Sequence, residues 1–330
     1  MLDLSPVPSG STSAEALRNT LDLARAAERW GFLRYWVAEH HNLPGLACPT
    51  PEVTVAHVAS ATSSIRVGSG GVMLPNHSPL RVAEAFRLLE AFHPGRIDLG
   101  IGRAAGTDQI TAYALRKGGA ASTEFPDQLA ELLAWGEGFP DDHPFSRVAA
   151  GPPDVPLPPI WILGSSDYGA RIAAELGLGF AFARHLNPRG AAEMMGLYRE
   201  SFSPGELPAP RAILTVSAIC ADTAGRAEEL AASMALGVVR MRQGRPDKLP
   251  SPEEAQEHHY TEEERDHVRR YRRAQVVGDP ASVRDQLQAL VEQTAADEVM
   301  VMTSVHDHGE RLRSYELLAE AFALAPAGAR

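Results

Sequence analysis

Cysteine is scarce in this sequence, and the features of membrane or secreted proteins are missing. The 330 residues include two cysteines, Cys48 and Cys220, which lie far apart. They cannot form a disulfide framework or a cysteine-type zinc site. No apolar stretch approaches the ~18 residues of a membrane span. Residues 1–6 lack the basic start and apolar stretch of a signal peptide. We therefore expect a soluble, cytoplasmic protein with no membrane contact.

An excess of positive charge is also missing. The 31 Lys and Arg are outnumbered by 42 Asp and Glu, for a net charge of −11. Because a duplex nucleic-acid binder needs clustered basic residues, this balance argues against one. An anionic small ligand stays open, since one arginine and the amides at a helix start can hold a phosphate. Hydrophobic residues at 44% and charged residues at 22% indicate an ordinary packed core.

Short apolar segments alternate with helical patterns along the whole chain. Eight segments read as strands: Leu2–Ser5, Leu33–Ala38, Ile65–Leu74, Ile97–Gly102, Ile160–Leu163, Gly179–Ala183, Ala212–Cys220 and Glu298–Thr303. Strand–helix alternation predicts a parallel sheet with crossover helices, and eight strands favour closure into a barrel. A missed strand would reopen an open, doubly wound sheet. We predict an α/β fold with one domain over residues 1–330, a (β/α)8 TIM-type barrel with insertions.

Two stretches are longer than the connections of a minimal barrel. Gly136–Pro159 is rich in Pro, Gly and Asp and predicts a long surface loop. Arg240–Arg272 is highly charged and precedes a predicted turn at Val277–Pro280. Long inserts in a compact domain are often lids or binding loops, so we predict a mobile lid at 240–272. A solvated excursion without function is the other interpretation.

The most informative cluster follows the second predicted strand and contains Glu39, His40 and His41. Active sites of such barrels form at the carboxyl ends of the strands. Because neighbouring side chains on a strand point to opposite faces, the two histidines are not expected to share a metal. A single histidine facing the pocket suits proton transfer, and we favour His40 over a purely structural histidine. Glu39 and His185, which follows the sixth strand, are predicted to line the pocket.

Three further segments fall at strand ends. Gly70 and Gly71 interrupt an apolar strand, which marks either a bulge or the close approach of a ligand. Arg103, after the fourth strand, can face an anion or form a surface salt bridge. Ser165 and Ser166 open a helix, where they can help hold a phosphate or simply cap the helix. Together these segments predict a site for an anionic ligand at the barrel mouth.

In this order, these pieces resemble the bacterial luciferase-like flavin monooxygenase family. The most specific matches are Trp36–Asn42, Gly68–Pro75 with His77-Ser78-Pro79, and Pro94–Arg103, and they are supported by Val277–Pro280 before a helix. The likeness extends from Leu2 to about Phe322. The sequence departs from luciferase at Gly102 and Ser165, where luciferase has a cysteine and an acidic residue. Light emission is therefore not implied, and we expect a non-luminescent member.

The resemblance implies FMN as cofactor and a role for each matched position. His40 would serve the flavin chemistry, and Gly70-Gly71 would lie under the flavin ring with a non-proline cis peptide. Phosphate would be bound by Arg103, Ser165, Ser166 and Tyr168. Family members use reduced FMN from a separate flavin reductase and are often homodimers. The expected reaction is oxidation of a small organic substrate by O2, without a metal.

Three other functions stay open at this point. A barrel of this family can use a deazaflavin for hydride transfer without oxygen. The chain could instead bind flavin without turnover. A metal-dependent hydrolase using His40 or His41 is the remaining alternative.

Overall fold

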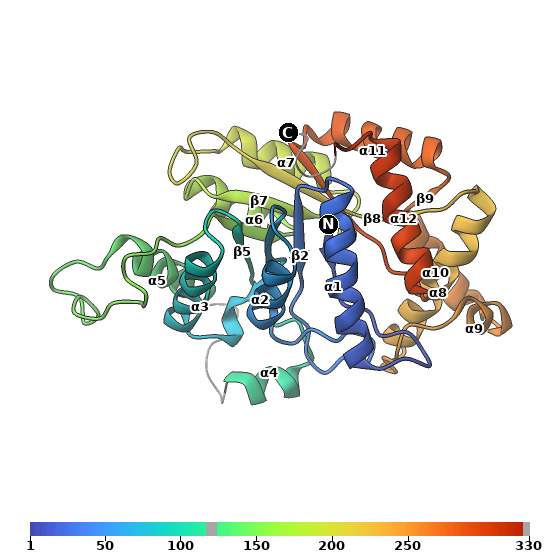
Figure 1. Ribbon diagram of the computed structural model, residues 1–330, viewed down its shortest axis with the longest axis horizontal. Helices are drawn as coiled ribbons and strands as arrows, with labels where there is room; N and C mark the ends of the chain where they lie inside the picture. The colour runs from blue at the N-terminus through green and yellow to red at the C-terminus, as the bar shows by residue number, and fades with distance from the viewer. Residues whose placement is uncertain (117–123, 326–330) are drawn as a thin grey trace.

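Ten parallel strands form one curved sheet in the computed structural model, which describes residues 1–116 and 124–325 (Figure 1). Eight of them follow the hydrogen-bonded order β1-β2-β3-β5-β6-β7-β8-β10, while β4 pairs with β5 and β9 with β8. The end strands β1 and β10 are also in contact, so the sheet is a nearly closed barrel. The predicted fold class is confirmed. The strands are β1 Leu2–Asp3, β2 Arg34–Val37, β3 Arg66–Ser69, β4 Val72–Met73, β5 Ile97–Gly102, β6 Ile160–Gly164, β7 Gly179–Ala183, β8 Ala212–Cys220, β9 Val276–Gly278 and β10 Glu298–Met302.

Helices surround the sheet in the alternation that the sequence predicts. They are α1 Ser13–Arg29, α2 Pro51–Ala61, α3 Pro79–Phe92, α4 Gln109–Arg116, α5 Phe125–Glu137, α6 Asp167–Glu175, α7 Ala191–Glu200, α8 Ala224–Arg242, α9 Pro252–Glu257, α10 Glu262–Arg272, α11 Pro280–Thr294 and α12 His308–Ala321, with a 3-10 turn η1 at Leu74–Asn76. Thr12 caps α1 by accepting a hydrogen bond from the Glu15 amide, as the capping pattern predicts. Gly31, after this helix, takes a φ of +84°, which glycine adopts without strain.

The third predicted strand and the last predicted turn differ from the structure. Ile65–Leu74 is divided into β3 and β4 because the chain bends at Gly70–Gly71, whose peptide bond is cis. The turn predicted at Val277–Pro280 is wrong in its first half. Val276–Gly278 forms β9 beside β8, and Asp279 then caps α11 through the Ser282 amide. Three residues are too short a run for the pattern of alternation to reveal a strand.

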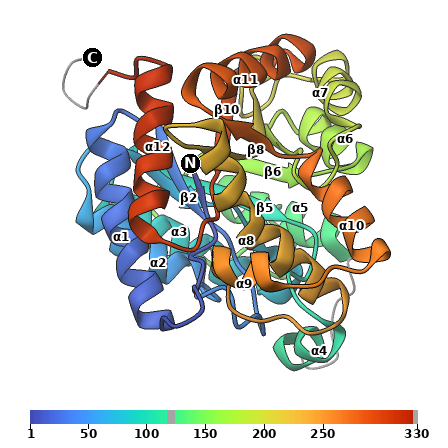
Figure 2. The ribbon, with the colours of Figure 1, turned by 90° about the vertical axis from the view of Figure 1, so that its right-hand side faces the viewer.

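The insert at 240–272 is mainly helical. It holds the end of α8, α9 and α10, which lie together on the side facing the viewer in Figure 2. Both short helices begin with a reciprocal capping box, at Ser251 and Thr261. Leu249 joins the loop after β1 through backbone hydrogen bonds with Val7 and Ser9 of 2.9 and 2.8 Å. The mobility predicted for this lid stays a prediction.

The other predicted insert is a loop, as expected. Residues 138–159 lie between α5 and β6 and project to the left in Figure 1. Phe139 packs edge-on against Trp135, with ring centroids 4.6 Å apart, and Phe145 stacks on the same indole at 5.5 Å. This aromatic cluster ties the base of the loop to α5.

Alternate side chains of the strands fill the barrel interior. One buried cluster is formed inside it by Leu2, Trp36, Ala38, Trp161, Ala181, Ile213, Met300 and Met302. The intervening residues pack in a larger cluster with the surrounding helices. This period of two fixes which residues at the carboxyl ends of the strands point into the mouth.

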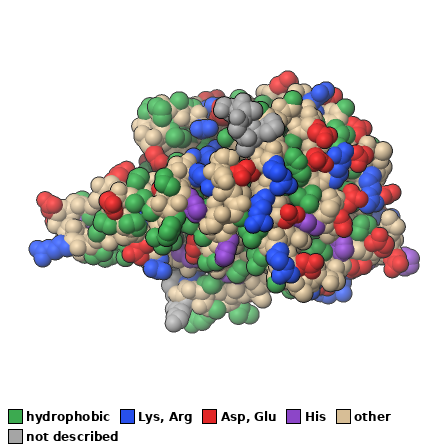
Figure 3. Space-filling view, in the orientation of Figure 1, with side chains coloured by type: hydrophobic (Ala, Val, Ile, Leu, Met, Phe, Trp, Pro, Cys, Tyr) green, Lys and Arg blue, Asp and Glu red, His purple; other side chains and the backbone are tan. Residues whose placement is uncertain are grey.

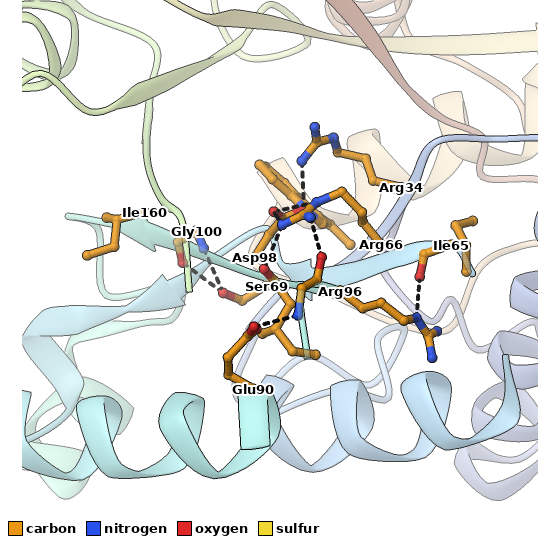
Figure 4. Close-up of polar contacts among 12 residues, drawn as sticks. Arg34, Ile65, Arg66, Ser69, Glu90, Arg96, Asp98, Gly100 and Ile160 are labelled. Carbon is orange, nitrogen blue, oxygen red and sulfur yellow. Dashed lines mark hydrogen bonds and ion pairs between the residues drawn. The ribbon is translucent and has the colours of Figure 1, made fainter. Parts of the chain in front are cut away.

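Buried charges close the amino-terminal end of the barrel (Figure 4). Asp98, at the start of β5, is fully buried. Its carboxylate accepts hydrogen bonds from Arg34 Nη1 at 2.6 Å and from Arg66 Nη2 at 2.6 Å. Trp36 Nε1 donates to the same carboxylate at 3.0 Å. Arg34 also pairs with Glu298, so this floor joins strands β2, β3, β5 and β10.

The surface divides into two regions in the view of Figure 3. Acidic and basic side chains are interspersed over the right half, where α1 and α12 lie, and hydrophobic side chains gather toward the left. Across residues 1–116 and 124–325, no helix combines the length and the apolar character needed to span a membrane.

Candidate active site

His40 and His185 meet at the carboxyl end of the barrel. Trp36 and Ala38 point inward from β2, so His40 continues the inward series two residues later. His185 lies in the turn directly after β7, close enough to His40 for the two rings to interact electrostatically. Burial lowers the pKa of His40, with Glu39 opposing the shift and His41 adding to it. Burial also lowers the pKa of His185 to about 4, opposed by the Thr215 backbone and reinforced by nearby His40. Both imidazoles are therefore neutral at pH 7.

Glu39 lies beside His40 in sequence but has a different environment. Its side chain is fully buried. The carboxylate accepts hydrogen bonds from His41 Nε2 at 2.8 Å, from the Met73 amide at 2.8 Å and from Asn76 Nδ2 at 3.1 Å. His77 Nε2 lies 2.9 Å from both carboxylate oxygens. The structure thus places Glu39 within the protein rather than along an open pocket wall, and it separates His41 from His40.

Gly70 and Gly71 lie in close contact with neighbouring strands of the barrel wall. A Cβ at Gly70 would come within 2.7 Å of Leu2 Cδ1 and 3.1 Å of Trp36 Cβ. A Cβ at Gly71 would come within 2.7 Å of the Gly100 carbonyl oxygen. Packing inside the protein therefore requires both glycines, whether or not a ligand also approaches them. The cis peptide between them is the conformation that the resemblance implies.

Arg103 stands at the end of β5 with its guanidinium over the Tyr168 ring, 4.2 Å from the centroid. It is exposed, and it pairs with no carboxylate among the described residues. The surface salt bridge considered for it is therefore absent from that part of the chain. Phe125 packs edge-on against Tyr168, with ring centroids 6.2 Å apart. The result is a positioned cation at the mouth without a counter-ion.

Ser165 and Ser166 lie between β6 and α6, just before Tyr168, on which Arg103 stacks. Ser166 is the N-cap residue of α6, yet its side chain makes no capping hydrogen bond. Simple capping thus does not account for its hydroxyl. The two serines line a cavity of about 660 Å³ between α6 and α7, together with Asn187 and Arg171. Free amides and hydroxyls at a helix start are groups that bind phosphate.

Unpartnered polar atoms near the mouth test whether a flavin fits. His40 Nδ1, Tyr168 Oη and Arg184 Nε are buried and have no hydrogen-bonding partner within the described ranges. Buried polar atoms are normally paired, so each of these calls for a ligand or a water. A flavin nucleotide offers a phosphate, hydroxyls and a polar ring edge, which match a cation, hydroxyls and ring nitrogens. Within residues 1–116 and 124–325, no three His, Cys, Asp or Glu side chains are arranged to hold a metal ion.

Comparison with known proteins decides the family. The profile described as Luciferase-like monooxygenase matches residues 1–298. The chain belongs to the luciferase-like monooxygenase family. A luciferase-like monooxygenase of Escherichia coli K12 is 43% identical, over 96% of this chain and 94% of that protein. The N-acetyl-S-alkylcysteine monooxygenase of Bacillus subtilis is 34% identical, over 97% of each chain. The predicted family and enzyme class are confirmed.

Solved structures extend the comparison to three dimensions. The crystal structure of apo-MsnO8 has a TM-score of 0.88 and 40% identity, over 99% of this chain and 98% of that chain. Two more distant structures share the fold alone. The oxygenating constituent of 3,6-diketocamphane monooxygenase from Pseudomonas putida, in complex with FMN, has a TM-score of 0.71 and 18% identity, over 97% and 96%. An F420-dependent secondary alcohol dehydrogenase has a TM-score of 0.66 and 14% identity, over 94% of each chain. The fold thus includes proteins that use FMN and proteins that use F420.

The sequence did not reveal the residues around Glu39. His77 and Asn76 follow β4 in the chain, more than 30 residues from Glu39, and no local pattern links them to it. The signal available was His77-Ser78-Pro79, which appears among the matched motifs but without a role.

Proposed function

We propose that this protein is the oxygenating component of a two-component monooxygenase that uses reduced FMN and O2. The observation that carries the proposal is the cation of Arg103, stacked on Tyr168 without a carboxylate partner among the described residues, at the barrel end where α6 begins. A flavin phosphate supplies the missing negative charge. As the family resemblance implies, a separate flavin reductase would deliver the reduced cofactor.

The protein's own residues would bind and orient the cofactor. Arg103 would pair with the phosphate, and the Ser165 and Ser166 hydroxyls with the α6 amides would donate hydrogen bonds to it. When bound, reduced FMN supplies two electrons to O2, so that one oxygen atom enters the substrate and the other leaves as water. His40, neutral at pH 7, has one ring nitrogen that can accept a proton and one that can donate. His185 would line the other side of the same mouth.

For the substrate we propose only a chemical class, and for the cofactor we propose two candidates. The relatives named as monooxygenases favour oxygen chemistry on a small organic molecule over hydride transfer. A deazaflavin is the second candidate, because the fold is shared with an F420-dependent dehydrogenase and the same phosphate-binding groups would serve it.

Anaerobic titration with reduced FMN, oxidised FMN and F420 tests this proposal. We expect reduced FMN to bind most tightly, and admission of O2 to reoxidise it with His40-dependent oxidation of a substrate. The comparison variant is His40→Ala. Preferential binding of F420 would favour the second candidate, binding without any oxidation would favour a flavin carrier, and no binding of either cofactor would refute both enzyme functions.

We also propose a homodimer formed through α2 and α3. These neighbouring helices expose Val53, Leu88 and Phe92, whose side chains are 53%, 51% and 71% accessible. Leu88 and Phe92 lie one helical turn apart on α3, and contiguous exposed apolar side chains commonly mark a protein contact. Light scattering of the wild type and of Phe92→Asp tests it, and a monomeric wild type at micromolar concentration would refute it.

A further inference from the structure

The Glu39 carboxylate connects two chain segments that end at the barrel mouth. One is the end of β2, which carries His40 and His41. The other runs from the end of β4 through the turn η1, and its Met73 amide, Asn76 and His77 all donate to Glu39. The first segment places the proposed proton-transfer group, and the second follows the Gly70–Gly71 bend. One buried carboxylate thus fixes the distance between two walls of the mouth.

Burying this many hydrogen-bond donors around Glu39 would cost free energy if the carboxylate lost its charge. Burial opposes ionisation of Glu39, but the hydrogen bonds from His77 and His41 outweigh it and hold the pKa of this carboxyl below its ordinary value. Burial likewise opposes a charged His77, while Glu39 outweighs it and raises the pKa of that imidazole. The pair is therefore an ion pair in weakly acidic solution. The hydrogen-bond donors around Glu39 are more numerous than a neutral side chain of the same size can satisfy.

Other titratable groups around the Glu39 cluster come from α2, from α4 and from the loop before α2. Glu52 on α2 favours the charged form of His77. Arg116 on α4 donates to the Asn76 side-chain oxygen. Cys48 faces Glu39 from the loop before α2, and burial raises the pKa of that thiol to about 11, so it is neutral.

His40 senses this cluster electrostatically. Of the neighbouring charges, Glu39 favours the protonated imidazole and His41 opposes it. His185, in the turn after β7, also interacts electrostatically with His40. The charge on Glu39 thus reaches the mouth even though the carboxylate itself is buried away from it.

We propose that Glu39 is a positioning residue, which clamps η1 to the end of β2 and so holds His40 in place at the flavin site. This inference rests on the proposed function for its catalytic consequence. It also makes a claim about His40 that holds with or without a cofactor.

The test compares Glu39→Gln with a matched control, Glu28→Gln. Glu28 is also a carboxylate clamp, since its Oε1 accepts from the amides of Ser63, Ser64 and Ile65 at 2.8, 2.6 and 3.0 Å. It holds the turn before β3, at the opposite end of the barrel. A glutamine at either site keeps the volume but replaces one acceptor oxygen with a donor. Both variants should lose stability.

Only Glu39→Gln should alter the site. We expect its kcat to fall about 10²-fold with a smaller change in KM, as for a misplaced catalytic group. Its His40 pKa should fall further, because the favourable charge is gone. His77→Gln keeps a donor to Glu39 but removes the cation, so it should shift the His40 pKa upward. NMR of protein labelled at histidine Cε1, with His40 assigned from His40→Asn, measures both shifts among the 12 histidines.

The outcomes separate this inference from the proposed function. Shifts of opposite sign in the two variants, with Glu28→Gln unchanged, support the positioning role. Equal turnover and an unchanged His40 titration in folded Glu39→Gln would overturn it. If that variant does not fold, an unshifted His40 in His77→Gln overturns it instead. A wild type that binds no flavin refutes the proposed function, while the NMR titration still decides the role of Glu39.

Discussion

Asp98→Asn isolates the buried charges at the floor of the barrel, far from the proposed site. The substitution keeps the shape of the side chain but replaces one carboxylate oxygen with an amide that donates hydrogen bonds. That amide must face either Arg34 or Arg66, which are themselves donors 2.6 Å from the present oxygens. Arg34 is only 2% accessible and keeps Glu298 as its remaining partner.

The expected loss of stability follows from the burial of the Asp98–Arg34 pair. Removing one partner of a buried ion pair costs about 3–5 kcal/mol, because the other charge stays buried without full compensation. An unfolding entropy of about 2.1 cal/mol/K per residue gives about 0.7 kcal/mol/K for a chain of this length. The melting temperature should then fall by about 4–7 °C.

Calorimetry, supported by urea unfolding, measures this loss. Asp222→Asn is the control, because the Asp222–Arg313 pair of 2.9 Å lies at the surface, where ion pairs contribute little to stability. FMN affinity should be equal in both variants. An Asp98→Asn protein no less stable than Asp222→Asn would refute the account of the floor as a charge network that needs Asp98.

Three further predictions concern the mouth. Arg103→Ala should weaken binding of reduced FMN by about 10- to 100-fold, since a charge-assisted hydrogen bond contributes about 1.5–3 kcal/mol; unchanged affinity in an anaerobic titration would exclude Arg103 as the phosphate ligand. His40→Asn should lower kcat by about 10²- to 10⁴-fold with little effect on flavin Kd, and full activity in stopped-flow assays would contradict its role in proton transfer. His185 has a pKa of about 4 when folded, below its ordinary 6.5, so the unfolded chain binds the extra proton and stability falls as pH drops between these values. From this group the wild type should lose about 2 kcal/mol between pH 7 and 5, and urea unfolding should show that His185→Gln lacks this loss.

Local patterns in the sequence were enough to predict the order of the elements and the chemistry at the strand ends. Ile97–Gly102, Gly179–Ala183 and Ala212–Cys220 are strands with the predicted bounds, because a run of apolar residues between turn signals specifies a buried parallel strand locally. The positions of His40 and Arg103 after their strands followed from the same local pattern. For a barrel, the end of a strand is already the region of the site.

The contacts that these side chains make depend on the tertiary structure. The division of the third strand at Gly70–Gly71 depends on contacts with Leu2, Trp36 and Gly100 from other strands. The short strand β9 forms by pairing with the end of β8, which local sequence does not indicate. The role of Glu39 depends on His77 and Asn76, which reach it only when the turn after β4 packs against the end of β2. Local periodicity carries no information about such contacts, since they form between residues that the chain brings together only when the barrel closes.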